Sequence, residues 1–313
     1  MTPRQFRKVA RMAHGSAWYR SPIVIGLVPA AAGAARRVGK GVFASGLARV
    51  GAVLLLIHAL IALAGVIWSP AISTISGDVN EAPTLDHPFG TDHLGRDVFT
   101  RLIAGSAKIV GVSFGAALCS VILGAGIGAI VAWKAGNVDA LVMRGIDVLL
   151  SFPMILVALL SAALLPQNYA SVLLVVAVVQ IPWVVRVARA IFGHAFAHDY
   201  VTAAILRREA MLSIVVREAL PNAAGPLLVE FALRWNFAVI LIASLNFLGV
   251  GVQPPTPDWG LMLFEARNHL VLAPWTGLAP ALAIASLAVA INFAADGLST
   301  ALAQRTVIVG QRR

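Results

Sequence analysis

Residues Val148–Val185 read VLLSFPMILVALLSAALLPQNYASVLLVVAVVQIPWVV, and none of them is Asp, Glu, Lys or Arg. A helix needs about 20 mostly apolar residues to cross the hydrocarbon core of a bilayer, so this stretch is long enough for two crossings. The turn-forming run Leu165-Pro166-Gln167-Asn168-Tyr169 divides it near the middle. The pattern predicts a hairpin of two membrane spans, near 148–165 and 169–188, joined by a very short loop.

The composition extends this interpretation to the whole chain. Its residues are 59% hydrophobic and only 12% charged, and the mean hydropathy is +0.86. An ordinary soluble chain is about 45–50% apolar and about 25% charged. The charged residues are too few to cover a water-exposed surface of this size, so the composition predicts an all-α membrane protein that crosses the bilayer several times.

Four further apolar stretches, near 51–68, 109–133, 226–248 and 278–295, bring the predicted number of spans to six. If the N-terminus is cytoplasmic, the cytoplasmic segments hold 19 Lys and Arg residues and the opposite segments hold four. The positive-inside rule then predicts that both termini are cytoplasmic. The expected organisation is a basic extension (1–46), a six-span domain (47–305) and a short basic tail (306–313).

The N-terminal region does not change the predicted class. Residues 1–50 contain nine Lys or Arg residues and no acid. Without interleaved aromatic residues, such a run favours anionic membrane lipid over nucleic acid as the partner. The apolar stretch Pro22–Ala35 resembles a signal peptide, but it is short and Arg36-Arg37 follows at once. We therefore expect an interfacial segment rather than a cleaved one.

Two motifs with possible chemistry fail on inspection. The string Gly33–Gly41 resembles a phosphate-binding loop, but five residues rather than four separate its glycines, and glycine replaces the magnesium-binding Ser or Thr. His194 and His198 stand four apart without a third ligand nearby in the sequence, which favours a solvated pair over a metal site. The sequence therefore predicts no metal site, no cofactor in this chain and no catalytic activity of its own.

Two patterns within the predicted spans concern packing and charge. Gly124 and Gly128 form a GxxxG spacing, as Gly111 and Gly115 do, and such spacings favour close helix packing in membranes. In the fifth span, Glu230 and Arg234 stand four apart, which predicts a helical ion pair. Charged groups at membrane depth commonly line a pathway, so we expect these two to do so; the alternative is a self-neutralising pair near the cytoplasmic boundary.

The cytoplasmic segment 189–222 is long, and its second part, residues 199–222, reads DYVTAAILRREAMLSIVVREALPN. Most of these residues are good helix formers, and Pro221 is expected to end the helix before Pro226 opens the fifth span. A helical hairpin outside the membrane has little of its own chain to bury against. We therefore expect it to dock on a partner.

This string resembles the coupling loop of binding-protein-dependent ABC importers, whose pattern is Glu-Ala-Ala, three residues, Gly, nine residues, Ile, one residue, Leu-Pro. Ala203-Ala204 and Leu220-Pro221 match, whereas Thr202, Arg208 and Glu218 replace Glu, Gly and Ile. An L-residue in the left-handed turn costs about 1–2 kcal/mol, so we expect a straighter helix at Arg208. The resemblance implies an ATPase-coupling site formed by Tyr200, Thr202, Ala203, Ala204, Arg208, Glu209, Leu220 and Pro221.

Two segments on the opposite side narrow the resemblance. Residues 87–102 read HPFGTDHLGRDVFTRL and residues 249–260 read GVGVQPPTPDWG. Both are similar to signature stretches of the C-type permease subunit of dipeptide and oligopeptide ABC importers, and Asn292 and Asp296-Gly297 match its last span. The likeness covers about residues 47–305 and implies the type I ABC importer permease architecture in a bacterial inner membrane.

These two segments are also interpretable on physical grounds. Arg96–Ser106 has an apolar and a polar face, which predicts an amphipathic helix at the outer interface, and the closely spaced prolines of 249–260 favour a stiff, extended loop. We expect an outer mouth that receives substrate from a binding protein; the alternative is that the segments only cap the span ends. The candidate contact residues are Asp92, Arg96, Asp97, Asp258 and Trp259.

The resemblance implies the permease subunit of an ATP-driven importer for dipeptides or oligopeptides, which forms half of the translocation pathway. The implied partners are a second homologous permease subunit, two cytoplasmic ATPase subunits or one fused ATPase that bind ATP and Mg, and an extracytoplasmic binding protein. The main alternative is a secondary transporter or channel driven by an ion gradient. Such proteins often contain inverted repeats, which are not evident here.

Overall fold

The computed structural model describes residues 46–67 and 75–310. The sequence predictions for residues 1–45, which include the basic extension, the signal-like stretch and the loop-like glycine string, lie outside the described residues. Within the described ranges all regular structure is helical, and an isolated β-bridge joins Thr91 to Asp97. The helices are α3 (Gly46–Ile67), α4 (Val98–Lys134), α5 (Gly136–Leu150), α6 (Met154–Ala163), α7 (Tyr169–Phe196), α8 (Asp199–Leu206), α9 (Met211–Ser213), the π-helix η1 (Ile214–Ala219), α10 (Leu220–Phe247), α11 (Trp259–Ala266) and α12 (Trp275–Gly310).

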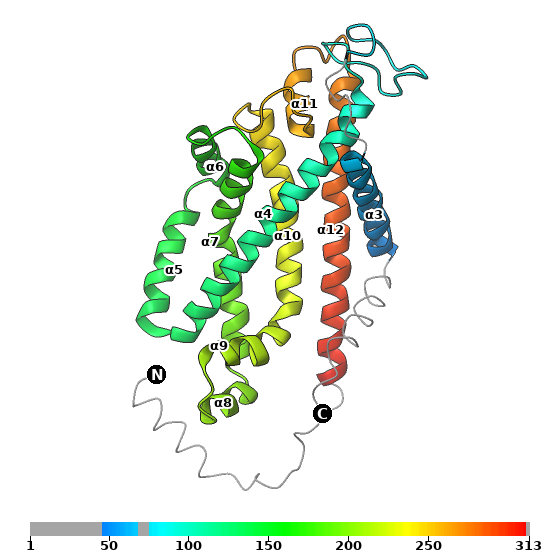
Figure 1. The fold of residues 1–313 in the computed structure, drawn as a ribbon. Coiled ribbons are helices and arrows are strands. Elements are labelled where there is room, and N and C mark those ends of the chain that lie inside the picture. Colours follow the sequence, from blue (N-terminus) through cyan, green and yellow to red (C-terminus); the bar gives the residue numbers. More distant parts are fainter. Residues whose placement is uncertain (1–45, 68–74, 311–313) are drawn as a thin grey trace.

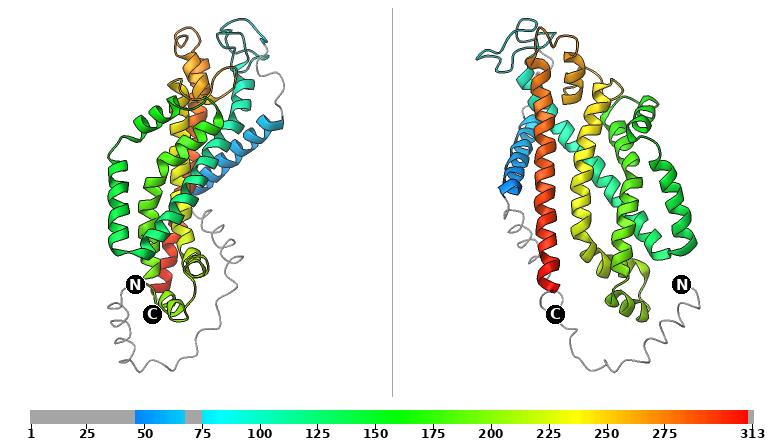
Figure 2. Two further views of the ribbon diagram at one scale, coloured as in Figure 1. Left: turned by 60° about the vertical axis from the view of Figure 1, so that its left-hand side comes forward. Right: turned by 180° about the vertical axis from the view of Figure 1, so that it is seen from behind.

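The long helices lie side by side, and α4 runs diagonally across α7 and α10 (Figures 1 and 2). Helices α3, α4, α7, the continuous run Met211–Phe247 and the Trp275–Thr300 part of α12 are long and apolar enough to cross a membrane. The pair α5 and α6 passes the same test with a bend of 79° between its members. The all-α prediction is confirmed, and the predicted six spans agree with the structure when this bent pair counts as one.

The molecule has two functionally different ends. We call the end with α8, α9 and η1 the coupling end, and the end with α11 and the loop before α4 the outer end (Figure 1). That the coupling end faces the cytoplasm stays a prediction from the distribution of Lys and Arg.

The third span departs from the straight helix predicted near 148–165. It begins at Gly136 as α5 and bends at Ser151–Pro153 before α6. Proline restricts the residue before it to extended backbone, so a helix cannot continue smoothly through Phe152 and Pro153. Both acids of α5 pair with arginines of α7: Asp139 with Arg189 and Asp147 with Arg186.

The helix predicted over Arg96–Ser106 begins at Val98 and is not a separate helix, and its place at the outer interface stays a prediction. These residues enter the first turns of α4, which continues without interruption to Lys134. Asp97 caps the start of α4, because its carboxylate accepts hydrogen bonds from the backbone amide and hydroxyl of Thr100 at 2.8 and 2.6 Å. Arg101, which was placed on the polar face, is buried with 2% exposure because carboxylates surround it.

Helix α4 packs closely on α7 through two of its glycines. A Cβ on Gly124 would lie 2.5 Å from the Cβ of Val184, and one on Gly128 would lie 2.8 Å from the Cβ of Ala188. Real side chains do not approach this closely, so only glycine permits the observed contact. The packing prediction for this GxxxG pair is confirmed, whereas Gly111 has open space beside it.

Candidate functional site

The coupling end is a short helical hairpin with its own small core. Val201 and Ala204 of α8 and Ile214 of η1 are fully buried against one another, and Trp133 and Phe196 cover them. This core explains why α8 folds outside the bundle. Of the predicted coupling residues, Ala204 belongs to the core and is not available to a partner.

The tip of this hairpin, residues 202–212, carries exposed side chains of mixed character. Leu206 is 65% exposed and Leu212 is 73% exposed, while Thr202 and Arg208 are exposed too. Exposed leucines are ordinary in the lipid-facing part of a bundle, but α8 lies beyond the nearby ends of α4 and α5 (Figure 1). These leucines are therefore candidates for contact with a protein partner.

Arg208 adopts the left-handed turn that the sequence argument assigned to glycine alone. Its φ is +59°, its amide donates to the carbonyl of Ile205 at 2.9 Å, and the amide of Glu209 donates to the carbonyl of Ala204 at 3.3 Å. These two bonds form the Schellman motif that ends many helices. The predicted straight helix at Arg208 is therefore wrong, because two carbonyls of α8 gain partners at a backbone cost of about 1–2 kcal/mol.

The return segment of the hairpin is continuous with the fifth span. Residues 214–219 form the π-helix η1, and the amide of Leu220 donates to the carbonyl of Val215, five residues earlier. The sequence predicted that Pro221 ends a helix, and this prediction is wrong. Pro221 lies in the first turn of α10, where a missing amide hydrogen is tolerated. The hairpin and the fifth span are therefore parts of one continuous helical run, Met211–Phe247.

A groove of about 490 Å³ lies beside the hairpin, between the ends of α7, α8 and α10. Its polar lining includes His194, His198, Tyr200 and Asn222. The Nδ1 of His198 lies 3.0 Å from the carbonyl oxygen of His194, so this ring turns back on its own helix. Among the described residues, no group of three or more His, Cys, Asp or Glu side chains is placed to hold a metal ion.

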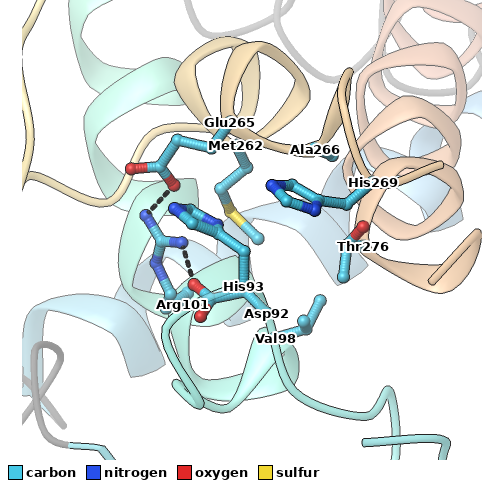
Figure 3. Close-up of a pocket in the computed structure, with 9 residues that line it drawn as sticks. All are labelled: Asp92, His93, Val98, Arg101, Met262, Glu265, Ala266, His269 and Thr276. Carbon is cyan, nitrogen blue, oxygen red and sulfur yellow. Dashed lines mark hydrogen bonds and ion pairs between the residues drawn. The ribbon is translucent and has the colours of Figure 1, made fainter. Parts of the chain in front are cut away.

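The outer end contains a buried cluster of four charges, two acidic and two basic. Asp92 Oδ2 accepts hydrogen bonds from Arg96 Nε at 2.7 Å and from Arg101 Nη1 at 2.6 Å. Glu265 of α11 pairs with the same two arginines at 3.1 and 2.7 Å. The four side chains are 2–9% exposed. Figure 3 shows Arg101 between Asp92 and Glu265, so the cluster joins the loop before α4 to α11.

The surroundings of this cluster determine how its groups titrate. Burial alone would raise the pKa of Asp92, but the amides of Arg96 and Leu94 and the charges of Arg101 and Arg96 outweigh it and lower that pKa. The ring of His93 stacks on that of His269, with 5.2 Å between centroids, at the edge of the cluster (Figure 3). Burial is the largest cause that lowers the pKa of His93, so its neutral form is favoured.

A second buried network organises the loop 249–258. Asp258 Oδ1 accepts hydrogen bonds from Asn246 Nδ2 at 2.7 Å and from the amides of Gly260 and Leu261, which caps α11. Asn246 Oδ1 in turn accepts the amide of Val252 at 3.0 Å. Complete burial raises the pKa of Asp258 above its usual range, and these hydrogen bonds only partly offset that effect.

The structure buries four of the five residues predicted to contact a binding protein. Asp92 and Arg96 are 4% exposed, Asp258 is fully buried, and Trp259 is 1% exposed and donates its indole hydrogen to the carbonyl of Leu102 at 2.8 Å. Asp97 keeps 13% exposure. These side chains hold the outer surface in shape rather than form it. The polar partners that the sequence analysis missed are Glu265 and Asn246, of which Glu265 is the one acid in the 259–277 stretch.

Glu230 and Arg234 form the ion pair expected from their spacing. Arg234 Nε lies 2.9 Å from Glu230 Oε1, and both residues are less than 9% exposed within this single chain. The guanidinium also lies 4.9 Å from the ring centre of Phe237, which is 43% exposed on the open face of α10. The pair itself is confirmed; its place in a pathway stays a prediction.

Comparison with known proteins gives consistent matches. Residues 124–308 match the family described as the binding-protein-dependent transport system inner membrane component, and this match includes the whole coupling end. A Brucella suis protein whose name assigns it as a permease of a peptide transport system is 38% identical over 264 residues, 84% of this chain and 89% of that protein. The glutathione transport system permease protein of Escherichia coli O157:H7 is 38% identical over 229 residues, 72% of this chain and 74% of that protein.

Proposed function

Since the chain belongs to the family of binding-protein-dependent transport system inner membrane components, we propose that it forms half of the pathway of an ATP-driven importer of short peptides. As a permease of this family it is a multi-pass protein of the bacterial plasma membrane and not an enzyme, and partner ATPases hydrolyse the ATP. The names of its relatives support the substrate class, because glutathione is itself a tripeptide.

The coupling end is the docking site for a cytoplasmic ATPase. The exposed Leu206 and Leu212 at the tip, together with the unbroken helical run from Met211 to Phe247, support this assignment. In the proposed mechanism, closure of two ATPase sites moves the hairpin, and α10 carries that movement through the membrane. This continuity between an exposed docking surface and a membrane span is the observation on which the proposal rests most.

The second permease subunit covers the open face of α10. Leu233, Phe237 and Ile240 are 37–45% exposed on this face, and the Glu230–Arg234 pair lies at its border. In the assembled importer the two subunits enclose a pathway that this pair lines. An extracytoplasmic binding protein delivers the peptide to the outer end, where the charge cluster and the Asp258–Asn246 network keep the loops in place.

Reconstitution tests this function. The chain, a second permease subunit, the ATPases and a binding protein are assembled in vesicles, and uptake of a labelled peptide is measured with and without ATP. Leu206→Asp is expected to abolish ATPase co-purification and uptake, because it places a charge in an apolar contact. Leu85→Asp, an equally polar change at a fully exposed outer leucine, is the matched control and should keep ATPase binding. Uptake that persists without the ATPases would contradict the proposal.

A further inference from the structure

The tip of the coupling end holds an arginine in a backbone conformation that favours glycine. Arg208 has a φ of +59° and occupies the position after the last residues of α8. Strained backbone of this kind persists only where the surrounding structure imposes it, and it is concentrated at functional sites. The turn holds the Cα–Cβ bond of Arg208 in a fixed direction, because two backbone hydrogen bonds close it.

The charge of Arg208 is unused within the part of the chain that the structure describes. The neighbouring Arg207 forms ion pairs with two carboxylates. Its Nε lies 2.7 Å from Glu209 Oε1, and its Nη2 lies 3.7 Å from Glu218 Oε1. No ion pair of Arg208 occurs among the described residues, and its side chain is exposed. Within the described residues, the tip therefore presents one guanidinium without an ion-pair partner, close in sequence to the exposed Leu206 and Leu212.

An arginine in this setting is suited to an ionic contact across a protein interface. Burial of the two leucines would exclude water around the guanidinium, and a pair with a carboxylate is strengthened when water is excluded. Arginine is also among the residues that most often dominate interface energies. A glycine would relieve the backbone strain but would offer no such contact.

We propose that Arg208 pairs with a carboxylate in the docking groove of the cytoplasmic ATPase and thereby determines which ATPase this permease accepts. This inference rests on the proposed docking of the coupling end. It assigns the ATPase partner an acidic residue opposite the tip. Arg208 is a specificity residue of the interface and takes no part in the hydrolysis of ATP.

The experiment compares binding with stability in the same variant. In Arg208→Gly the isolated permease should unfold at a higher temperature than the wild type, because the left-handed strain is removed. The affinity of this variant for the immobilised ATPase, measured in detergent, should nevertheless fall about tenfold or more. The dependence of that affinity on salt concentration should flatten. A merely structural role would move both quantities in the same direction. Arg208→Lys keeps the charge and should lose less affinity.

Two controls make the outcome decisive. Arg267→Gln removes an exposed positive charge from the outer end and should leave ATPase affinity and its salt dependence unchanged. Arg208→Glu should bind poorly, and one acid-to-arginine change in the ATPase groove should restore binding. Unchanged affinity and salt dependence in Arg208→Gly would overturn the inference. If Leu206→Asp also bound normally, the docking proposal itself would fail, so the two failures are distinguishable.

Discussion

The two ends of the molecule hold their charges in opposite ways. At the outer end, the buried Arg101 pairs with the carboxylates of Asp92 and Glu265, and its pair with Glu265 joins α4 to α11. At the coupling end, the ion pairs of Arg207 are exposed, the helix widens into a π turn, and Arg208 lies in a strained conformation. Buried ion pairs thus connect the elements of the outer end, whereas the coupling end keeps its charges exposed, on the surface where we propose that the ATPase docks.

The same substitution at each end tests this difference, and its largest effect is expected at the outer end. Arg101→Gln should lower the free energy of unfolding of the purified subunit by about 3–5 kcal/mol, because it leaves Asp92 and Glu265 buried with one cation between them. Chemical denaturation in detergent measures this loss. A loss below about 1 kcal/mol would show that the cluster is hydrated and that the outer end is no more rigid than the coupling end.

Acid should weaken the outer end by a smaller amount. The folded protein lowers the pKa of Asp92 below its ordinary value of 3.8, so this carboxylate stabilises the fold above that pH. The stabilisation is lost as the pH falls through the lowered pKa. Unfolding temperatures measured between pH 5 and about 2.5 should show this decline in the wild type and a shallower one in Asp92→Asn. Identical slopes in the two proteins would contradict the assignment.

At the same end, the charge of Asp258 is expected to affect folding stability in the opposite direction to that of Asp92. Its buried Oδ2 has no hydrogen-bond partner among the described residues, and burial raises its pKa, so folding disfavours the charged form of this side chain. Asp258→Asn keeps the acceptor for Asn246, Gly260 and Leu261 and removes that charge. We expect a change within about 1 kcal/mol in unfolding experiments at pH 7. A loss of 3 kcal/mol would mean that Oδ2 has a partner.

The smallest effect is expected at the coupling end. Arg207 is 54% exposed, and solvent screens its pairs with Glu209 and Glu218. Exposed pairs contribute about 0–1 kcal/mol, so Arg207→Gln should unfold almost as the wild type does. Parallel measurement with Arg101→Gln makes the comparison direct. Equal losses in the two variants would remove the distinction between the ends.

The features that could be predicted from the sequence are those set by nearby residues. Charge scarcity and apolar length predicted the membrane class, and a spacing of four predicted the Glu230–Arg234 pair, because both partners lie on one helix. Glycine spacing likewise predicted a close helix contact at Gly124, although it did not identify Val184 as the partner.

The features that escaped prediction depend on partners far away in the chain. Glu265 lies 169 residues from Arg96, so nothing near either residue indicates their contact. Helix α5 was not predicted as part of the third span, because the charge-free stretch begins at Val148 and the pairing of Asp139 and Asp147 with arginines of α7 is not visible in the sequence. The turn at Arg208 was missed because the cost of its backbone was weighed without the two hydrogen bonds that it allows.

The unbroken helical run from Met211 to Phe247 has a consequence for energetics. At 1.5 Å per residue its 37 residues measure about 55 Å along the helix axis, from the coupling end to the outer end, where Asn246 holds the loop, and the run bends between α9 and α10 (Figure 1). One continuous helical run thus connects the two places at which we propose that different proteins bind. Thermodynamic linkage then requires reciprocity: whatever factor the nucleotide state imposes on binding-protein affinity, binding-protein docking imposes the same factor on nucleotide affinity. The coupling free energy between the two binding sites would therefore be the same whichever partner binds first.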